Sequence, residues 1–466
     1  MRPRFRWTLL AATLAMLLGA LPAAADHEDF PSTKNMIAIG HSENPGVFSA
    51  NAADRDNVNS DLAFWGDLAI HGRYNGFRIV DISAPGNPRL VGEALCDGDQ
   101  GDVIVWENYV VRSWNSPAGA GVECGGEPVP QGFEGFHVFD ISDVSSPQLI
   151  DSLELSSRAG ADAFGCGSHT ATAVPDLGNN RLIIYNSTSG GPCSWVGVIE
   201  LDLATGTLTH LRDEPRDGPS HDVGVLLGDV NLMVSAGHAM AHVWDISGSL
   251  EDPELLYTIA EPGVGTGGNF HSAALTWDGE VIVLGWEPGG GSQAECEAGD
   301  PDVKKSMFFY DADTGAKLGQ WVLERPQGPD ENCTIHNYNI VPLRSGDYVA
   351  VGGHYQGGTW VVDFTDPANA EAVAWADPES LGPGPFCSAT APPGCQLGGA
   401  WSSYWYNGFI YESDITRGLN VYKAATSALA GAIRVPHMNP QTQEFSLPSG
   451  RLTGPPPGVP AGRGGR

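Results

Sequence analysis

Apolar and polar residues alternate in short runs along most of the chain, and the runs are separated by clusters of Asp, Gly, Ser and Pro. Alternation with a period of two is typical of β-strands with one buried face, and such polar clusters are typical of turns. The segments GFRIVDISAPGNPRLVGEAL (76–95) and GFHVFDISDVSSPQLIDSLEL (135–155) show the pattern most clearly. No helical period of useful length appears after residue 25, so the pattern predicts an all-β fold.

This strand–turn–strand pattern repeats about every fifty residues, and two more alternating runs precede each copy. Four strands per unit at this period are typical of a β-propeller. We count seven units, at 56–95, 100–155, 166–213, 219–260, 268–324, 333–378 and 398–426. The last unit lacks a clear fourth strand, and the apolar segment 35–44 is expected to supply it. The sequence therefore predicts a seven-bladed β-propeller of four-stranded antiparallel blades, closed by an N-terminal strand.

Both ends of the chain differ in composition from the repeats. Residues 1–25 resemble a secretory signal peptide, with basic residues first, an apolar run at 9–21 and small residues Ala23–Ala25 before the cleavage point. We expect this segment to be removed and the protein to be secreted, as a bacterial export product. Residues 26–438 are then a single propeller domain, and the Pro/Gly-rich segment 439–466 is a disordered tail. No later apolar run is long enough to predict a membrane span.

The charge balance narrows the choice of partners. The chain has 56 acidic against 24 basic Lys and Arg residues, a formal net charge of −32. A nucleic-acid binder needs a basic surface, so this class is excluded. A small molecule or an extracellular protein remains as the partner, and the sequence does not set an oligomeric state.

The chain has eight cysteines, an even number that favours disulfides in an exported protein. None of their spacings matches a zinc knuckle. We expect sequence neighbours to pair, as Cys96–Cys124, Cys166–Cys193, Cys296–Cys333 and Cys387–Cys395.

The repeat itself resembles a known family. The pattern G-[FL]-x-[IV]-[VF]-D-I-S-x-P-x-x-P-x-[LV] is similar to the LVIVD repeat of bacterial and archaeal surface or secreted proteins. It fits best at 76–92, 135–153 and 242–257, and more loosely at 360–373. The resemblance implies a β-propeller and leaves the activity open, because function depends on the site that a fold bears.

Four consecutive units place a histidine at one repeat position, in CGSHT, GPSHD, GNFHS and CTIHN. These residues are His169, His221, His271 and His336, at intervals of 52, 50 and 65 residues. The first strand of each propeller blade lines the central channel, so equivalent positions lie at one height. Converging neutral imidazoles suit Fe²⁺, Cu or Zn²⁺, and the column therefore predicts a transition-metal site at one mouth of the channel.

Further candidates lie near this column. The second strands end in His71, His238, Glu287, His354 and Glu412. Metal-bound imidazoles need an acceptor for their other N–H, and we expect Glu287, Glu412 and Asp222 to provide it. His238, His354 and His71 are candidates for further ligands or substrate contacts. The segments 202–206, 311–315 and 295–302 could hold Ca²⁺, but tight turns or a solvated loop explain them better.

Two functions remain open at this point. In one, the protein is a secreted metalloenzyme that acts on a small molecule, by oxidation with Fe or Cu or by hydrolysis with Zn. In the other, it is a non-enzymatic extracellular binding or scaffold propeller whose channel histidines are structural. Whether the chain is an enzyme is therefore left open, and its metal content would separate the two functions.

Overall fold

The structure is a computed structural model of the chain. It describes residues 30–44, 58–98, 100–156, 166–188, 193–228, 230–264, 268–288, 295–329, 331–378 and 398–444. The expected signal peptide and the pair Cys387–Cys395 lie outside the described residues.

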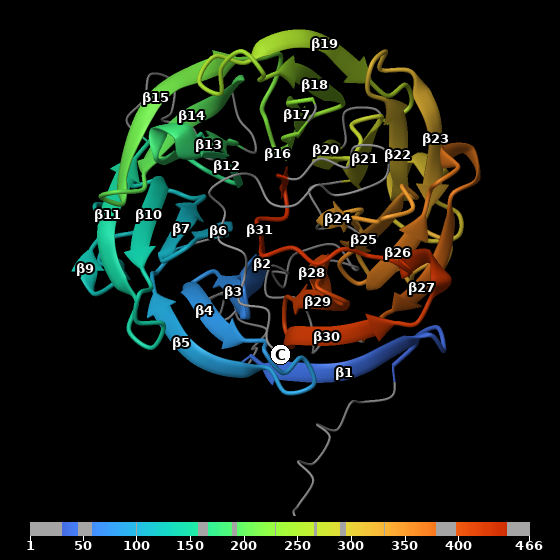
Figure 1. Cartoon of the computed structure of the whole chain (residues 1–466), viewed down its shortest axis with the longest axis horizontal. Coiled ribbons are helices and arrows are strands. Elements are labelled where there is room, and N and C mark those ends of the chain that lie inside the picture. The colour runs from blue at the N-terminus through green and yellow to red at the C-terminus, as the bar shows by residue number, and fades with distance from the viewer. Residues whose placement is uncertain are drawn as a thin grey trace, which may run out of the picture.

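Seven four-stranded antiparallel blades surround a central channel, which confirms the predicted fold (Figure 1). From the channel outward, blade 1 contains β2 (Asn59–Trp65), β3 (Leu68–Arg73), β4 (Gly76–Asp81) and β5 (Arg89–Leu95), and blade 2 contains β6 (Val103–Trp106), β7 (Tyr109–Trp114), β10 (Gly135–Asp140) and β11 (Gln148–Glu154). Blade 3 contains β12 (Ala171–Asp176), β13 (Arg181–Asn186), β14 (Trp195–Asp202) and β15 (Thr207–Pro215), and blade 4 contains β16 (Asp222–Leu226), β17 (Leu232–Gly237), β18 (Met240–Asp245) and β19 (Glu254–Ala260). Blade 5 contains β20 (Gly268–Leu275), β21 (Val281–Pro288), β22 (Ser306–Asp311) and β23 (Lys317–Val322), and blade 6 contains β24 (Tyr338–Ile340), β25 (Val349–Gly353), β26 (Thr359–Asp363) and β27 (Glu371–Ala376). Blade 7 contains β28 (Ala400–Tyr406), β29 (Phe409–Asp414), β30 (Gly418–Ala424) and β1 (Met36–Glu43).

Blade 7 closes the ring with a strand from the other end of the chain. β1 pairs antiparallel with β30, from Met36 opposite Ala424 to Glu43 opposite Gly418. This confirms that the segment 35–44 supplies the missing fourth strand. A one-residue irregularity interrupts the outer strand pair of every blade, which adds the local twist that fits each blade against the next.

The core lies between neighbouring blades, because both faces of the inner strands are covered. Every residue of β6 is buried, whereas β11 at the rim alternates between exposed and half-buried positions. Large side chains fill the gaps between blades, as where Phe77 of blade 1 meets Phe139 of blade 2 edge to face at 5.1 Å. The alternation in the sequence therefore reflects blade stacking.

The remaining elements are short. They are the strands β8 (Glu123–Cys124), β9 (Glu127–Pro128), β31 (His437–Met438) and β32 (Thr442–Gln443), and the 3₁₀ turns η2 (Leu177–Asn179), η4 (Asp302–Lys305), η5 (Pro367–Asn369) and η6 (Ser427–Leu429). Among the described residues, no helix is long and apolar enough to cross a membrane.

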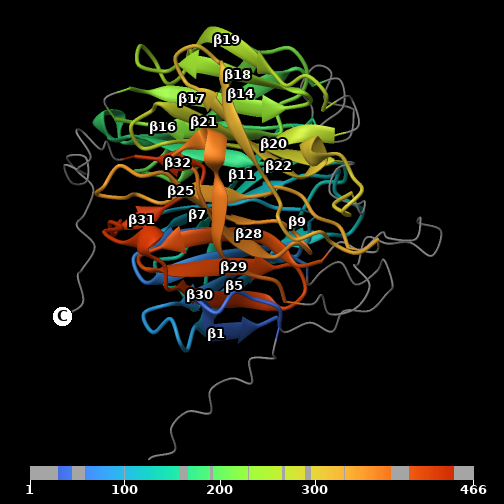
Figure 2. The same ribbon diagram turned by 90° about the vertical axis from the view of Figure 1, so that its right-hand side faces the viewer.

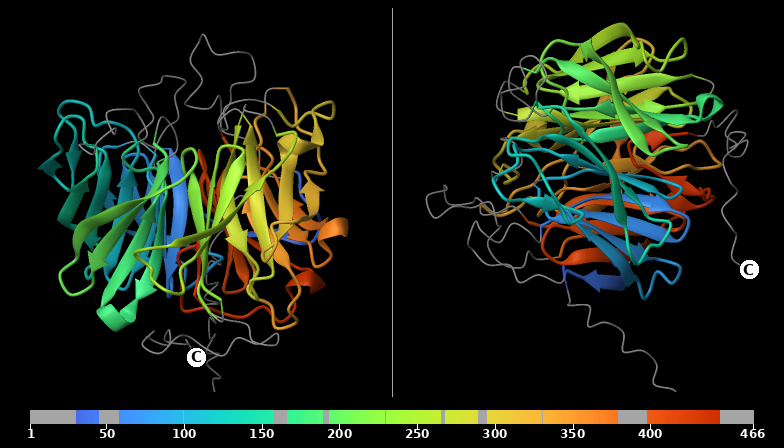
Figure 3. Two further views of the ribbon diagram at one scale, coloured as in Figure 1. Left: turned by 90° about the horizontal axis from the view of Figure 1, so that it is seen from above. Right: turned by 90° about the vertical axis from the view of Figure 1, so that its left-hand side faces the viewer.

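Residues 432–444, which we call the C-terminal strap, cross the end of the channel where the inner strands finish (Figures 1, 2 and 3). β31 pairs with the end of β2, and β32 pairs with the end of β16. The strap also bonds to Val105 of blade 2, Ala173 of blade 3, Leu275 of blade 5, Pro342 of blade 6 and Asn407 of blade 7. It thus contacts all seven blades.

The expected start of a disordered tail at residue 439 is wrong for residues 439–444. Asn439, Thr442 and Gln443 are buried and bond to the ends of the inner strands, and Glu444 is buried beside His437 of the strap. Residues 445–466 lie outside the described part of the chain.

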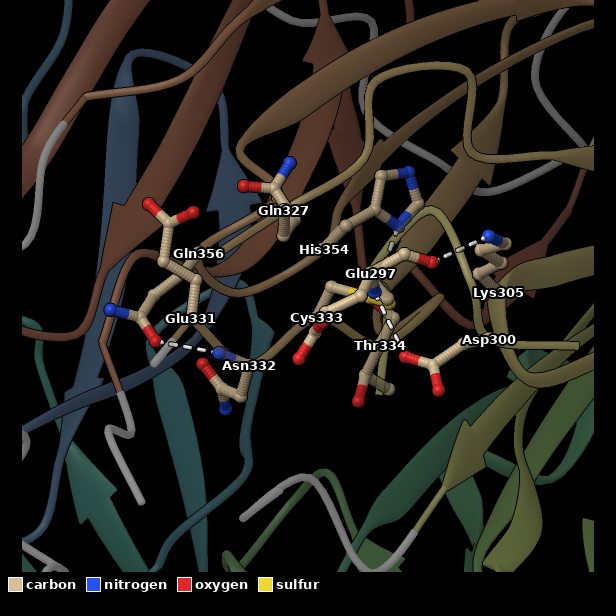
Figure 4. Close-up of a disulfide and its surroundings, with 12 residues drawn as sticks. Glu297, Asp300, Lys305, Gln327, Glu331, Asn332, Cys333, Thr334, His354 and Gln356 are labelled. Carbon is tan, nitrogen blue, oxygen red and sulfur yellow. Dashed lines mark hydrogen bonds between the residues drawn. A yellow bond between two sulfur atoms is a disulfide. The ribbon is translucent and has the colours of Figure 1, made fainter. Parts of the chain in front are cut away.

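Three of the predicted disulfides form, which confirms these neighbour pairings: Cys96–Cys124, Cys166–Cys193 and Cys296–Cys333. The third joins the segment before β22 to the segment that leads into β24 (Figure 4). It thereby links blades 5 and 6 three residues before His336.

Candidate metal centre

The four histidines of the repeat column lie together where the inner strands begin. His169, His221 and His336 stand just before β12, β16 and β24, and His271 lies within β20. All four are buried, and consecutive rings have centroids 4.5, 4.1 and 3.8 Å apart. The four rings therefore form a row along one wall of the channel, contributed by blades 3 to 6.

Each of these rings has an acceptor beside its Nδ1 atom. The acceptors are Asn115 Oδ1 for His169 at 3.0 Å, the His271 carbonyl for His221 at 3.2 Å, Ser272 Oγ for His271 at 2.6 Å and the Trp401 carbonyl for His336 at 2.5 Å. The Ser272 hydroxyl donates its own proton to the His336 carbonyl at 2.5 Å, so it accepts from His271. The carbonyls beside His221 and His336 and the Ser272 hydroxyl beside His271 place these ring protons on Nδ1, and the Asn115 oxygen, as the amide is oriented in the structure, does the same for His169. In this arrangement each Nε2 keeps a lone pair.

Two of these lone pairs face each other at short range. His169 Nε2 and His221 Nε2 are 3.1 Å apart, and neither carries a proton in the tautomers above. Two nitrogens bound 2.0–2.1 Å from one ion would be about 2.9 Å apart at right angles and about 3.3 Å apart in a tetrahedral site. The observed 3.1 Å lies between these two values, in a range that two ligands of one ion share with two hydrogen-bonded nitrogens.

The pKa values of the four imidazoles determine their protonation state at neutral pH. Burial lowers the pKa of all four imidazoles, to about 3 for His169, and mutual repulsion lowers them further. All four imidazoles are therefore neutral at neutral pH, which is the form in which imidazole can bind a metal.

Glu287 at the end of β21 belongs to this cluster more directly than expected. Its Oε2 lies 3.8 Å from His221 Nε2 and accepts a hydrogen bond from Asn269 at 3.0 Å. Donor atoms of His221, His271 and Glu287 all lie within 4.8 Å of one another. Glu287 therefore lies on the Nε2 side of the imidazoles, where a metal would bind, and does not accept the proton of an Nδ1 atom. Burial raises its pKa to about 8.

The other two carboxylates expected to orient the histidines do not do so. Glu412 on β29 accepts from Asn420, Tyr422 and Thr359, so it serves the packing of blades 6 and 7. Asp222 accepts from the Val223 N–H at 2.7 Å and from the Thr170 side chain, and it lies close enough to Asp61 for the two carboxyls to repel each other. Both predictions were wrong because backbone carbonyls, Asn115 and Ser272 already accept the Nδ1 protons.

The three additional histidines also lie apart from the cluster. His71 bonds to Ser413 at 2.9 Å and to Arg78 at 3.1 Å, between blades 1 and 7. His238 is exposed in the turn between β17 and β18. His354 bonds to the Thr334 carbonyl at 3.2 Å and packs beside Trp321 (Figure 4). None of them bonds to an imidazole of the column.

The proposed calcium segments are turns in the structure. Asp202 Oδ1 accepts from the N–H groups of Ala204 and Thr205, and Asp311 Oδ1 accepts from both donors of Thr314. In the acidic segment 295–302, Glu295 pairs with Lys304. Side-chain capping of tight turns accounts for these residues.

A buried carboxylate layer follows the histidines along the channel. Asp61, Asp102 and Asp222 are fully buried, and burial together with mutual repulsion raises the pKa of Asp102 and Asp222 well above the usual range. Asn337 of blade 6 and Gln441 of the strap both donate to Asp61. Asp61, Asp102, Trp401 and three of the histidines line one small void, so the two layers share the channel.

The fold and this cluster define the protein as a seven-bladed β-propeller with a buried histidine site in its channel. The family model of the LVIVD repeat matches residues 61–95 and 132–154, in blades 1 and 2. The chain therefore contains LVIVD repeats, as the resemblance implied.

A search of solved structures finds similar chains at low sequence identity. The Dos1 propeller shares 10% identity over 79% of this chain and 78% of its own, with a TM-score of 0.46. A chain of the Mitotic Checkpoint Complex shares 10% identity over 90% and 99%, with a TM-score of 0.46. The N-terminal domain of Nup159 shares 10% identity over 85% and 97%, with a TM-score of 0.44. No curated protein sequence matches the chain.

Proposed function

We propose that His169, His221, His271 and His336 bind a divalent transition metal, Fe, Cu or Zn, and that the site acts on a small molecule in the channel. The observation that supports this most is the 3.1 Å separation of the Nε2 atoms of His169 and His221, each with its proton on Nδ1. Two facing lone pairs repel each other unless a cation lies between them. A purely structural pair would place a donor against an acceptor, which here requires the Asn115 amide to be turned over so that it donates to His169 Nδ1.

The remaining residues have definable roles around such an ion. Asn115, Ser272 and two backbone carbonyls fix the imidazole tautomers. Glu287 supplies an acidic group at the donor side of His221. When bound, the ion would supply Lewis-acid or one-electron chemistry. The histidines come from neighbouring blades, so donors occupy one side and the opposite wall is left for a substrate.

Export is part of the same proposal. Residues 1–25 have the pattern of a signal peptide, and three disulfides form in the described structure. Disulfides are typical of oxidising compartments outside the cytosol. We therefore place the metal site in an extracellular protein.

Metal analysis of the purified mature chain tests the proposal. The chain is stripped with a chelator, offered Fe²⁺, Cu²⁺ and Zn²⁺ in turn, desalted and analysed by mass spectrometry for bound metal. We expect one metal per chain in the wild type and loss of binding in the double variant His221→Ala/His271→Ala. His71→Gln is the matched control, because His71 is equally buried but lies between blades 1 and 7. A wild type that retains none of these metals would refute the proposal.

A further inference from the structure

Tyr355 brings a phenol into the histidine cluster. Its hydroxyl lies 2.7 Å from His336 Nε2, and it shares a second hydrogen bond with Glu287. The tyrosine ring packs 4.3 Å from the His336 ring, and the side chain is only 3% exposed. Since Nδ1 of His336 donates to Trp401, Nε2 accepts the phenol proton, and the phenol oxygen lies on the donor side of this imidazole.

The backbone holds this tyrosine in an unusual conformation. Tyr355 has a φ of +46°, in the left-handed region that costs free energy for a residue with a bulky side chain. Paired backbone bonds to Ala400, at 2.8 and 2.9 Å, fix Tyr355 against blade 7. The next residue, Gln356, bonds both ways with Asn332, beside the Cys296–Cys333 disulfide (Figure 4). Strain that several interactions enforce is a feature of functional sites.

The charge of the cluster gives the phenol a role. Four neutral imidazoles cannot compensate the charge of a buried metal ion, and an uncompensated buried charge is costly. Among the described side chains, Tyr355 and Glu287 are the acidic groups that contact these imidazoles. Two donor atoms 2.0–2.1 Å from one ion at right angles are about 2.9 Å apart, close to the separation of Tyr355 Oη and His336 Nε2.

We propose that Tyr355 is a further ligand of the metal and coordinates it through the phenolate oxygen next to His336. The inference rests on the proposed metal site and goes beyond it by adding an anionic oxygen donor. On binding, the O–H bond of Tyr355 breaks, the oxygen–metal bond forms, and one proton is released to water. A phenolate is a hard anionic donor, so among the proposed metals it favours Cu²⁺ and iron supplied in its oxidised form, Fe³⁺.

Absorption spectroscopy provides the test, because phenolate bound to Fe³⁺ or Cu²⁺ produces a charge-transfer band in the visible region. The mature chain and two variants are loaded with each ion, and bound metal is measured in the same samples. We expect the wild type to show the band and Tyr355→Phe to bind one ion per chain without it. Tyr404→Phe is the control, since Tyr404 is a buried channel tyrosine whose hydroxyl bonds to Asp61. It should keep the band.

The possible failures can be told apart. If the wild type binds no metal, the proposed function fails and this inference fails with it. If the wild type binds one Fe³⁺ or Cu²⁺ without a visible band, or if Tyr355→Phe keeps the band, only the phenolate ligand is refuted. Resonance Raman spectra excited in the band detect phenolate ring vibrations in the wild type, so the test also works if Tyr355→Phe folds poorly.

Discussion

The buried histidine cluster should make the metal-free protein sensitive to acid, and His169 allows a quantitative test. Burial lowers the pKa of His169 to about 3, from an unfolded value of about 6.5. A pKa that is lowered on folding stabilises the protein above pH 6.5, and this contribution is lost as the pH falls towards 3. At pH 5 the unfolded chain binds a proton that the folded chain excludes, which costs about 2 kcal/mol.

The variant His169→Asn removes this titration while keeping a polar side chain beside Asn115. Unfolding free energies of both proteins are measured in guanidinium with a chelator present, by tryptophan fluorescence at pH 7.5 and pH 5. The buried carboxyls titrate in both proteins, so their effects cancel in the difference. We expect the wild type to lose about 2 kcal/mol more than the variant over this interval. A second pair of measurements at pH 8 provides the control, because the histidine is neutral in both states there. A difference between the two proteins that stays constant from pH 7.5 to pH 5 would show that His169 is not held neutral by the fold.

Two further predictions concern the frame around the site. Truncation after Val435 should lower the free energy of unfolding by several kcal/mol. It removes β31, β32 and the side-chain hydrogen bonds of Asn439 and Thr442, and each such bond is worth about 0.5–1.5 kcal/mol. A chain that ends at Glu444 is the control and should match the full chain in thermal unfolding. Gly92→Ala should destabilise by about 1–3 kcal/mol, because a Cβ there would lie 1.7 Å from the Val144 carbonyl of blade 2. Gly178→Ala, where a Cβ meets no atom within 4 Å, should be neutral in the same denaturant titration, and equal effects of the two substitutions would contradict this view of blade packing.

The sequence predicted the blades and the histidine column because both follow from a repeat. A repeated strand places equivalent residues at one height in the channel, so His169, His221, His271 and His336 could be aligned without coordinates. The predicted closure by residues 35–44 followed from the missing fourth strand of the last unit. These features depend only on the order and period of the strands.

The surroundings of the histidines could not be predicted in the same way. Backbone carbonyls of His271 and Trp401 accept two of the Nδ1 protons, and a carbonyl leaves no sequence signal. Glu412 ends a second strand as Glu287 does, but its side chain turns towards Asn420 and Tyr422. Tyr355 lies in a left-handed turn outside the repeat pattern, so alignment of the units could not place it near His336.

The uneven distribution of residues around the ring determines how a ligand can reach the cluster. Blades 3 to 6 provide the imidazoles, whereas blades 7, 1 and 2 place Trp401, Ser60 and Gly101 at the same repeat position. Gly101, Trp401, Asp61 and Asp102 line the void that the histidines face, so the wall opposite the donors is aromatic and acidic. The strap crosses the other end of the channel and bonds to all seven blades, so approach from that end would require these bonds to break. The end where the inner strands begin is the one that the strap does not cross, and a ligand of the proposed site that enters there meets the imidazoles before the carboxylate layer.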